Sequence, residues 1–101
     1  MNYNIPKKLQ FGGQIIKVKV LKTVEKEGAV GCYYSLLNEI HIQTHVEGAP
    51  MPVEKVEQIF WHEYAHALTD SCRDEDLCAN EPLIDLMGEF LYQSLGKLKW
   101  K

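Results

Sequence analysis

Two histidines and a glutamate form the part of the sequence with the clearest chemistry. His62, Glu63 and His66 stand in the order His-Glu-Tyr-Ala-His. On a helix, residues four apart project from the same face, one turn apart. Two imidazole nitrogens at this separation can both reach one zinc ion at about 2.0–2.1 Å. The spacing therefore predicts that His62 and His66 are ligands of one Zn²⁺.

Glu63 is predicted to act on water rather than on the metal. It points about 100° around the helix from His62, away from the direction that both histidines share. A carboxylate there can still reach a water molecule on the ion, and zinc lowers the pKa of that water to about 7. We therefore expect Glu63 to be the general base of a metal-dependent hydrolase. The alternative is two surface histidines and an ordinary charge pair on an amphipathic helix.

A third ligand is needed, because a catalytic zinc site takes three protein ligands and keeps one open position. No histidine follows His66. Glu81, Asp85 and Glu89 form a polar stripe with four-residue spacing on a predicted apolar helix. Glu81 is the first choice, and Asp85 and Glu89 are the alternatives. A solvent-facing edge would also explain Asp85 and Glu89, and Asp85 could instead accept a hydrogen bond from the second nitrogen of a ligand histidine.

The order His62-Glu63-x-x-His66, followed by Glu81-x-x-x-Asp85, resembles the zincin metallopeptidases of the gluzincin type. It is most similar to the small ImmA/IrrE-like and related phage-encoded metallopeptidases. The resemblance covers roughly the second half of the chain, and the preceding sheet in outline. It implies a minimal zincin-like fold that hydrolyses peptide bonds, with His62, His66 and Glu81 as the zinc ligands and Glu63 as the base.

The chain departs from that family's pattern at two positions. Ile84-Asp85 stands where the pattern has Ala-Asn, and Pro82 directly follows the ligand position. The third histidine of metzincins is also missing. The resemblance further implies a protein or peptide substrate, and the host cytoplasm as the compartment of a phage-encoded protein.

A zinc-containing binding module is the rival hypothesis: it would cut nothing, or would cut only on engaging a partner. Structural zinc sites are usually closed by four protein ligands. A fourth ligand such as Cys72 or Cys78 would therefore favour the module, whereas three protein ligands would favour the enzyme. Glu63 favours the enzyme, because a purely structural site needs no base at that position.

Composition restricts the class of protein. With 101 residues, 46% of them hydrophobic and 25% charged, the chain is expected to form one globular domain over residues 1–101. A net charge of −3 gives no general attraction to nucleic acid or to an anionic membrane. No apolar run is long enough for a membrane span, and the first residues lack a secretory signal. Three cysteines are then expected to be reduced thiols of a cytoplasmic protein.

The first half of the chain reads as short strands. Gly12-Gly13 predicts a hairpin turn between residues 9–11 and 14–21. Ile16, Val18 and Val20 alternate with lysines, which predicts one buried face. Residues 32–35 and 39–43 are expected to form two strands around a turn at Leu37-Asn38, with 39–43 as an edge strand that could pair with an extended substrate. The stretch 48–52 is expected to break the sheet pattern.

Two helices are predicted in the second half, so the fold class is α+β, with a small, mostly antiparallel sheet of three or four strands before the helices. The first helix is expected from Val53 to about Thr69. The second begins near Asn80-Glu81-Pro82, since proline is tolerated in a first turn, and ends near Gly96. Residues 74–76 are expected to be a solvated loop. Tyr33 and Tyr34 are adjacent. The hydroxyl of either could donate a hydrogen bond to an oxyanion, or both rings could pack on the sheet.

Overall fold

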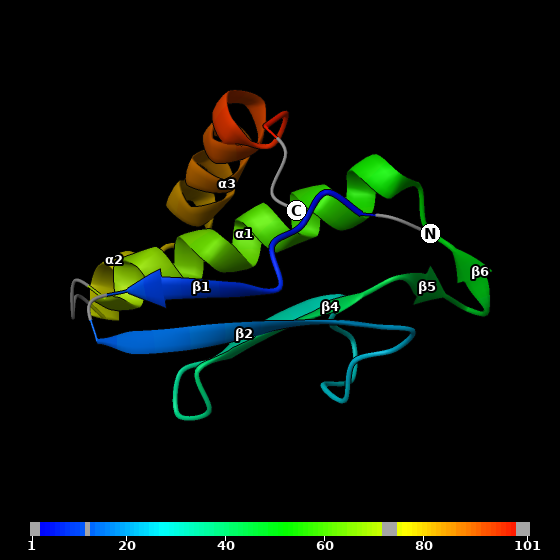
Figure 1. Cartoon of the computed structure of the whole chain (residues 1–101), viewed down its shortest axis with the longest axis horizontal. Helices are drawn as coiled ribbons and strands as arrows, with labels where there is room; N and C mark the ends of the chain where they lie inside the picture. Colours follow the sequence, from blue (N-terminus) through cyan, green and yellow to red (C-terminus); the bar gives the residue numbers. More distant parts are fainter. Residues whose placement is uncertain (1–2, 12, 72–74, 99–101) are drawn as a thin grey trace.

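A mixed sheet with helices stacked on one face forms the structure (Figure 1). The computed structural model describes residues 3–11, 13–71 and 75–98. The α+β class predicted from the sequence is confirmed. In chain order the elements are β1 (Lys8–Phe11), β2 (Gln14–Leu21), β3 (Gly31–Tyr34), β4 (Glu39–Gln43), β5 (His45–Val46), β6 (Ala49–Pro50), α1 (Val53–Ser71), α2 (Glu75–Ala79) and α3 (Glu81–Leu95).

The four-stranded sheet has the order β1-β2-β4-β3. The outer pairs, β1 with β2 and β3 with β4, are antiparallel, whereas β2 and β4 are parallel, with Val18 opposite Ile40. The prediction that residues 39–43 form an edge strand is therefore wrong: β4 is interior, and β3 is the edge. Two hairpins joined by a parallel pairing produce this order, and local alternation of residue types carries no information about such a pairing.

One face of the sheet is buried beneath α1, as Figure 1 shows. Ile16, Ile40 and Ile42 point into this core. Because α1 lies over β3 and β4, the last part of β2 is less covered, and Val20 is 40% exposed. The predicted buried face of β2 therefore holds for Ile16 and is wrong for Val20.

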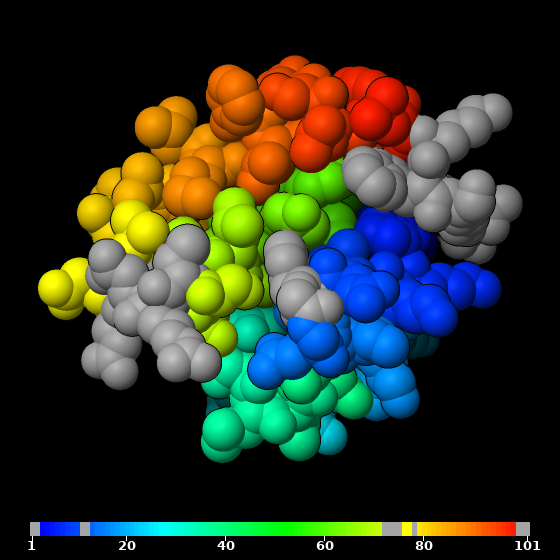
Figure 2. All heavy atoms as spheres, turned by 60° about the vertical axis from the view of Figure 1, so that its left-hand side comes forward, coloured from blue at the N-terminus to red at the C-terminus, as the bar shows by residue number. Residues whose placement is uncertain are grey.

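Helix α1 lies between the sheet and α3, so it buries residues on two sides. Val56 and Phe60 belong to the core between α1 and the sheet, as the helical spacing predicted. Trp61 is almost fully buried and lies near Gly96, at the end of α3. The space-filling view shows α3, in orange and red, on the outer side of α1, with the strands on the other side (Figure 2). No helix in the described ranges is long and apolar enough to cross a membrane.

Helix α3 begins where Pro82 predicted, and Asn80 adds a cap that was not predicted. The Asn80 side chain accepts a hydrogen bond of 3.2 Å from the Leu83 backbone N–H, which caps the helix, and Pro82 lies in the first turn. Glu81 is thereby the first residue of α3. At the other end, the Gly96 N–H donates to the carbonyl groups of Leu91 and Tyr92.

Two short elements differ from the predictions. Residues 75–79 form the helix α2, where a loop was predicted for 74–76; Asp74 itself lies outside the described residues. Strands β5 and β6 form a small hairpin in a region expected to break the sheet pattern. Glu47 and Gly48 both have positive φ, of 51° and 82°, which suits the two-residue turn between these strands.

Candidate metal centre

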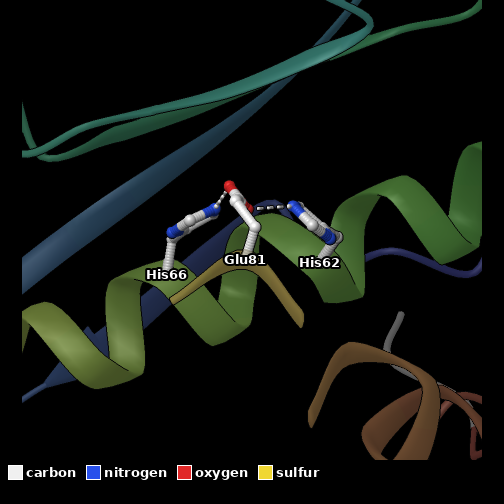
Figure 3. A group of neighbouring side chains, drawn as sticks. All are labelled: His62, His66 and Glu81. Atoms are coloured by element: carbon white, nitrogen blue, oxygen red, sulfur yellow. Dashed lines mark hydrogen bonds and ion pairs between the residues drawn. The ribbon is translucent and has the colours of Figure 1, made fainter. Parts of the chain in front are cut away.

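His62 and His66 lie side by side on α1, as residues one helical turn apart must. Their ring centroids are 5.0 Å apart, and the ring planes meet at 71°. In Figure 3 both side chains point toward Glu81, which comes from the start of α3. The two imidazoles therefore converge on one place rather than on separate surroundings.

The Glu81 carboxylate lies between the two rings. Its Oε1 is 3.1 Å from His66 Nε2, and its Oε2 is 3.7 Å from His62 Nε2. One donor atom from each of the three residues can be chosen so that all lie within 4.8 Å of one another. Donors around a tetrahedral zinc are about 3.4 Å apart, given zinc–ligand distances of about 2.0–2.1 Å. A small inward movement would thus allow the three donors to meet one ion.

The chemistry of these donors fits zinc. Two neutral imidazoles and one carboxylate are a known ligand set for a catalytic zinc ion. Within the described ranges, no second group of three His, Cys, Asp or Glu donors lies this close together. Glu89 also lines the cleft but is outside the group, so among the three carboxylates of the predicted stripe only Glu81 faces both histidines.

Gly88 explains how α3 comes this close to α1. A Cβ atom at this position would lie 3.0 Å from His62 Cα and 3.2 Å from the His62 backbone nitrogen. Glycine in a helix costs about 1 kcal/mol relative to alanine, so a mid-helix glycine calls for a packing reason. Here it permits the backbone approach that brings the first turn of α3 to the histidines. Gly88 was not predicted as a site residue, although a glycine within a predicted helix was a signal available in the sequence.

Asp85 contacts Nδ1, the other ring nitrogen of His62. Its Oδ1 is 2.9 Å from His62 Nδ1, one turn along α3 from Glu81. With Nδ1–H donating to the carboxylate, the lone pair on Nε2 is directed toward the candidate metal position. Asp85 therefore contacts the His62 nitrogen that faces away from the candidate metal position, which agrees with the outer role considered for it as an alternative to a third ligand.

Removing this carboxylate should weaken zinc binding without abolishing it. We expect Asp85→Ala to lower the zinc affinity by about 10- to 100-fold, because the His62 ring loses the partner that fixes its tautomer and orientation. Competition with a chromophoric chelator measures the affinity. Glu89→Ala is the matched control on the next turn and should bind zinc nearly as tightly as the original chain. A larger loss in Glu89→Ala than in Asp85→Ala would contradict the assignment of both residues.

Glu63 is a buried carboxylate at the wall of the same site. Only 8% of it is exposed. It lies against β3, where a Cβ atom on Gly31 would come within 3.2 Å of Glu63 Oε2 and 2.6 Å of Ile59 Cγ2. Gly31 is thus a second glycine that sequence analysis missed, and it allows the edge strand to lie directly on the predicted base.

Burial raises the pKa of Glu63 to about 7, and the negative charge of Glu81 adds to this. Lys26 and a hydrogen bond from the Tyr33 backbone N–H lower the pKa, but by less than burial raises it. Desolvation destabilises the charged form of a carboxylate, which is why the buried side chain keeps its proton to a higher pH than an exposed one.

In metal-free protein this shift should make stability depend on pH. A folded-state pKa of about 7, above the ordinary value of 4.5, means that folding binds a proton more tightly. The contribution of this protonation to the stability of the folded state is complete below about pH 4.5 and is lost as the pH rises through about 7. With chelator present, we expect Glu63→Gln to increase the free energy of unfolding at pH 8 by up to about 3 kcal/mol, and to change it little at pH 4.5. Urea denaturation measures both values.

The matched control is Glu54→Gln, an exposed glutamate in the first turn of the same helix. Its effect on the free energy of unfolding should stay within about 0.5 kcal/mol at both pH values. An equal effect of Glu63→Gln at pH 4.5 and pH 8 would show that burial of the charge is not the cause.

These groups line an open cleft of about 790 Å³. The edge strand β3 supplies one wall through Gly31 and Tyr33, α1 supplies the floor, and α3 supplies the opposite wall. The volume lies within the range typical of small-ligand and substrate sites. The candidate metal centre is thus accessible from outside rather than enclosed.

The two candidate tyrosines fall on opposite faces of β3. Tyr33 lines the cleft, and its hydroxyl donates a hydrogen bond of 2.9 Å to Asp70 Oδ2. Tyr34 lies on the other face of the sheet, with its ring 4.7 Å from that of His41. Of the two, only Tyr33 is placed to meet a molecule bound in the cleft.

Within the described residues, the remaining histidines lie outside the group of donors, and Cys32 lines the cleft without joining that group. His41 Nε2 lies 2.8 Å from Glu39 Oε1, and His45 Nδ1 lies 2.7 Å from Thr44 Oγ1. The side chains of Cys72 and Cys78, the alternative fourth ligands, lie outside the described part of the chain.

No protein-family model, curated protein or solved structure matches this chain.

Proposed function

We propose that this chain is a zinc-dependent metallopeptidase. His62, His66 and Glu81 would hold the ion, and Glu63 would be the general base. The observation that carries the proposal is the convergence of these three donors within 4.8 Å, in an open cleft that also contains a buried carboxylate. Three protein donors leave one position for water or substrate, which is the pattern of catalytic rather than structural zinc sites.

The chain's own residues have separate tasks in this reaction. Zinc, when bound, lowers the pKa of water and polarises a carbonyl group. Glu63 takes the proton from the attacking water at its carboxylate and delivers it to the nitrogen of the leaving amine. The Tyr33 backbone N–H holds the Glu63 carboxylate in place, and Asp85 holds the His62 ring.

The edge strand supports a peptide as the substrate. The Val30 carbonyl accepts a hydrogen bond of 2.8 Å from the Gln43 backbone N–H of β4. Because backbone groups alternate in direction along an antiparallel strand, Gly31 directs both its N–H and its C=O group away from β4. Tyr33 faces the same side, where its N–H donates to Glu63. An extended peptide can pair with such an edge, and its carbonyl groups would then pass along the site.

Metal content and peptide cleavage together test the proposal. The protein is purified without chelator or metal-affinity resin, and its zinc is measured by elemental analysis. Zinc-loaded protein is then incubated with a defined peptide mixture, and new termini are identified by mass spectrometry. We expect about one zinc per chain, and cleavage that chelator abolishes and zinc restores. Stoichiometric zinc without any cleavage would favour the binding module, and loss of all metal during gentle purification would exclude both.

A further inference from the structure

The two ends of the cleft carry different charges. Lys55 lies in the first turn of α1 and Asp70 in its last turns, and both line the cleft. Lys26, from the loop before β3, also lines it. The cleft is therefore not uniformly acidic, although the chain as a whole has a net charge of −3.

The two lysines lie toward the same end. Gly31 lies against Ile59 and Glu63, whereas the Tyr33 hydroxyl reaches Asp70. Strand β3 therefore runs alongside α1 in the same direction. The loop that precedes β3, with Lys26, must then lie toward the beginning of α1, where Lys55 is. Asp70 marks the opposite end.

The acidic side chains at the centre are already engaged. Glu81 lies between the two histidines, and Asp85 contacts His62. Glu89 is the remaining carboxylate on the α3 wall. The basic end thus presents two ammonium groups, and two carboxylates that no histidine engages lie near them. Glu63, on which Lys26 also acts, is buried, whereas Glu89 lines the open cleft. An additional carboxylate would therefore be attracted there.

The direction of a bound peptide follows from the strand. Antiparallel pairing is slightly more stable than parallel pairing. A peptide that pairs with β3 in this way runs opposite to it, so the part that follows the scissile bond lies toward Lys26 and Lys55. Lys55 precedes His62 by seven residues, which is about 10 Å along the helix axis. At about 3.3 Å per residue, this corresponds to the second or third residue beyond the bond.

We propose that the Lys26–Lys55 end of the cleft selects a carboxylate two or three residues C-terminal to the scissile bond. This inference rests on the proposed peptidase function and specifies its substrate class. The carboxylate can come from an Asp or Glu side chain or from the end of the peptide chain. Both sources present the same charge to the two ammonium groups.

Peptides with an N-terminal mercaptoacetyl group test this directly, because the thiolate binds zinc and the following residues occupy the side in question. The three probes are mercaptoacetyl-Ala-Glu-Glu-amide, mercaptoacetyl-Ala-Gln-Gln-amide and mercaptoacetyl-Ala-Gln-Gln with a free C-terminal carboxylate. Titration calorimetry uses zinc-loaded Glu63→Gln protein, so that nothing is cleaved. We expect the Glu probe to bind about fivefold more tightly than the Gln amide, as for a partly exposed charge pair. Tighter binding of the free acid than of the Gln amide identifies the chain end as a second acceptable source.

Charge reversal locates the effect. Lys26→Glu with Lys55→Glu should remove or invert the preference for the Glu probe. The matched control, Lys8→Glu with Lys17→Glu, changes the net charge equally on the cross-strand pair of β1 and β2 and should keep the preference. Equal binding of all three probes, or a preference unaffected by the Lys26 and Lys55 changes, overturns the selectivity alone. Failure of every probe to bind zinc-loaded protein overturns the proposed function as well.

Discussion

Zinc binding should be lost when His66 is replaced by alanine. His66 Nε2 and His62 Nε2 are directed at the same carboxylate, so removal of one ring leaves two of the three donors. Changes to outer residues of zinc sites already cost about 10- to 100-fold in affinity. We therefore expect His66→Ala to weaken zinc binding by more than about 100-fold. Elemental analysis after dialysis and chelator competition measure the loss.

His45→Ala is the matched control, because it removes an equally large ring from a strand outside the cleft. It should keep about one zinc per chain. Far-ultraviolet circular dichroism of both variants checks that the helices remain folded. Full zinc retention in His66→Ala would mean that the ion is held elsewhere, and the assignment of His62 and Glu81 would fail with it.

Peptide cleavage should nearly stop in Glu63→Gln, while zinc remains bound. Glutamine has almost the same shape as glutamate and can still accept the hydrogen bond from the Tyr33 N–H. It cannot take a proton from water at neutral pH. A positioned general base typically contributes about 10²- to 10⁴-fold to the rate. We expect a decrease in kcat of that size, with the zinc affinity changed by less than about tenfold.

The same experiment with Glu89→Gln provides the control, since this carboxylate lines the cleft without joining the group of donors. Its kcat should stay within about threefold of the original value. Undiminished cleavage by Glu63→Gln would end the role proposed for Glu63. Loss of both zinc and cleavage would instead assign Glu63 to metal binding.

These two variants distinguish residues that bind zinc from the residue that acts in catalysis. His66→Ala should lose both zinc and cleavage, whereas Glu63→Gln should lose cleavage alone. A non-catalytic zinc module predicts a different pattern, with zinc loss in His66→Ala and no cleavage in any variant, including the original chain.

Local signals in the sequence were sufficient for the helices. Apolar spacing predicted α1, and Pro82 after Asn80-Glu81 predicted where α3 begins, because the tolerance of proline in a first turn depends only on neighbouring residues. The four-residue spacing of His62 and His66 likewise placed both rings on one face of α1. These properties follow from helix geometry within about one turn and need no distant partner.

The third member of the candidate site was different. Glu81, Asp85 and Glu89 share one helical stripe, so spacing alone kept all three open. Which of them faces the histidines depends on where α3 crosses α1. That crossing depends on a close backbone approach at Gly88, far along the chain from the histidines it contacts.

The sheet order was also decided only in three dimensions. The pattern of β4 predicted a strand but wrongly an edge, since β2 and β4 pair in parallel and leave β3 outside. Burial of Glu63 depends on that same arrangement, because β3 must lie against α1 with only a glycine, Gly31, at the point of contact. The sequence alone thus determined which residues could do chemistry and on which helix. Only the tertiary structure decided which carboxylate meets the histidines and which strand encloses the base, because both depend on contacts between segments distant in the chain.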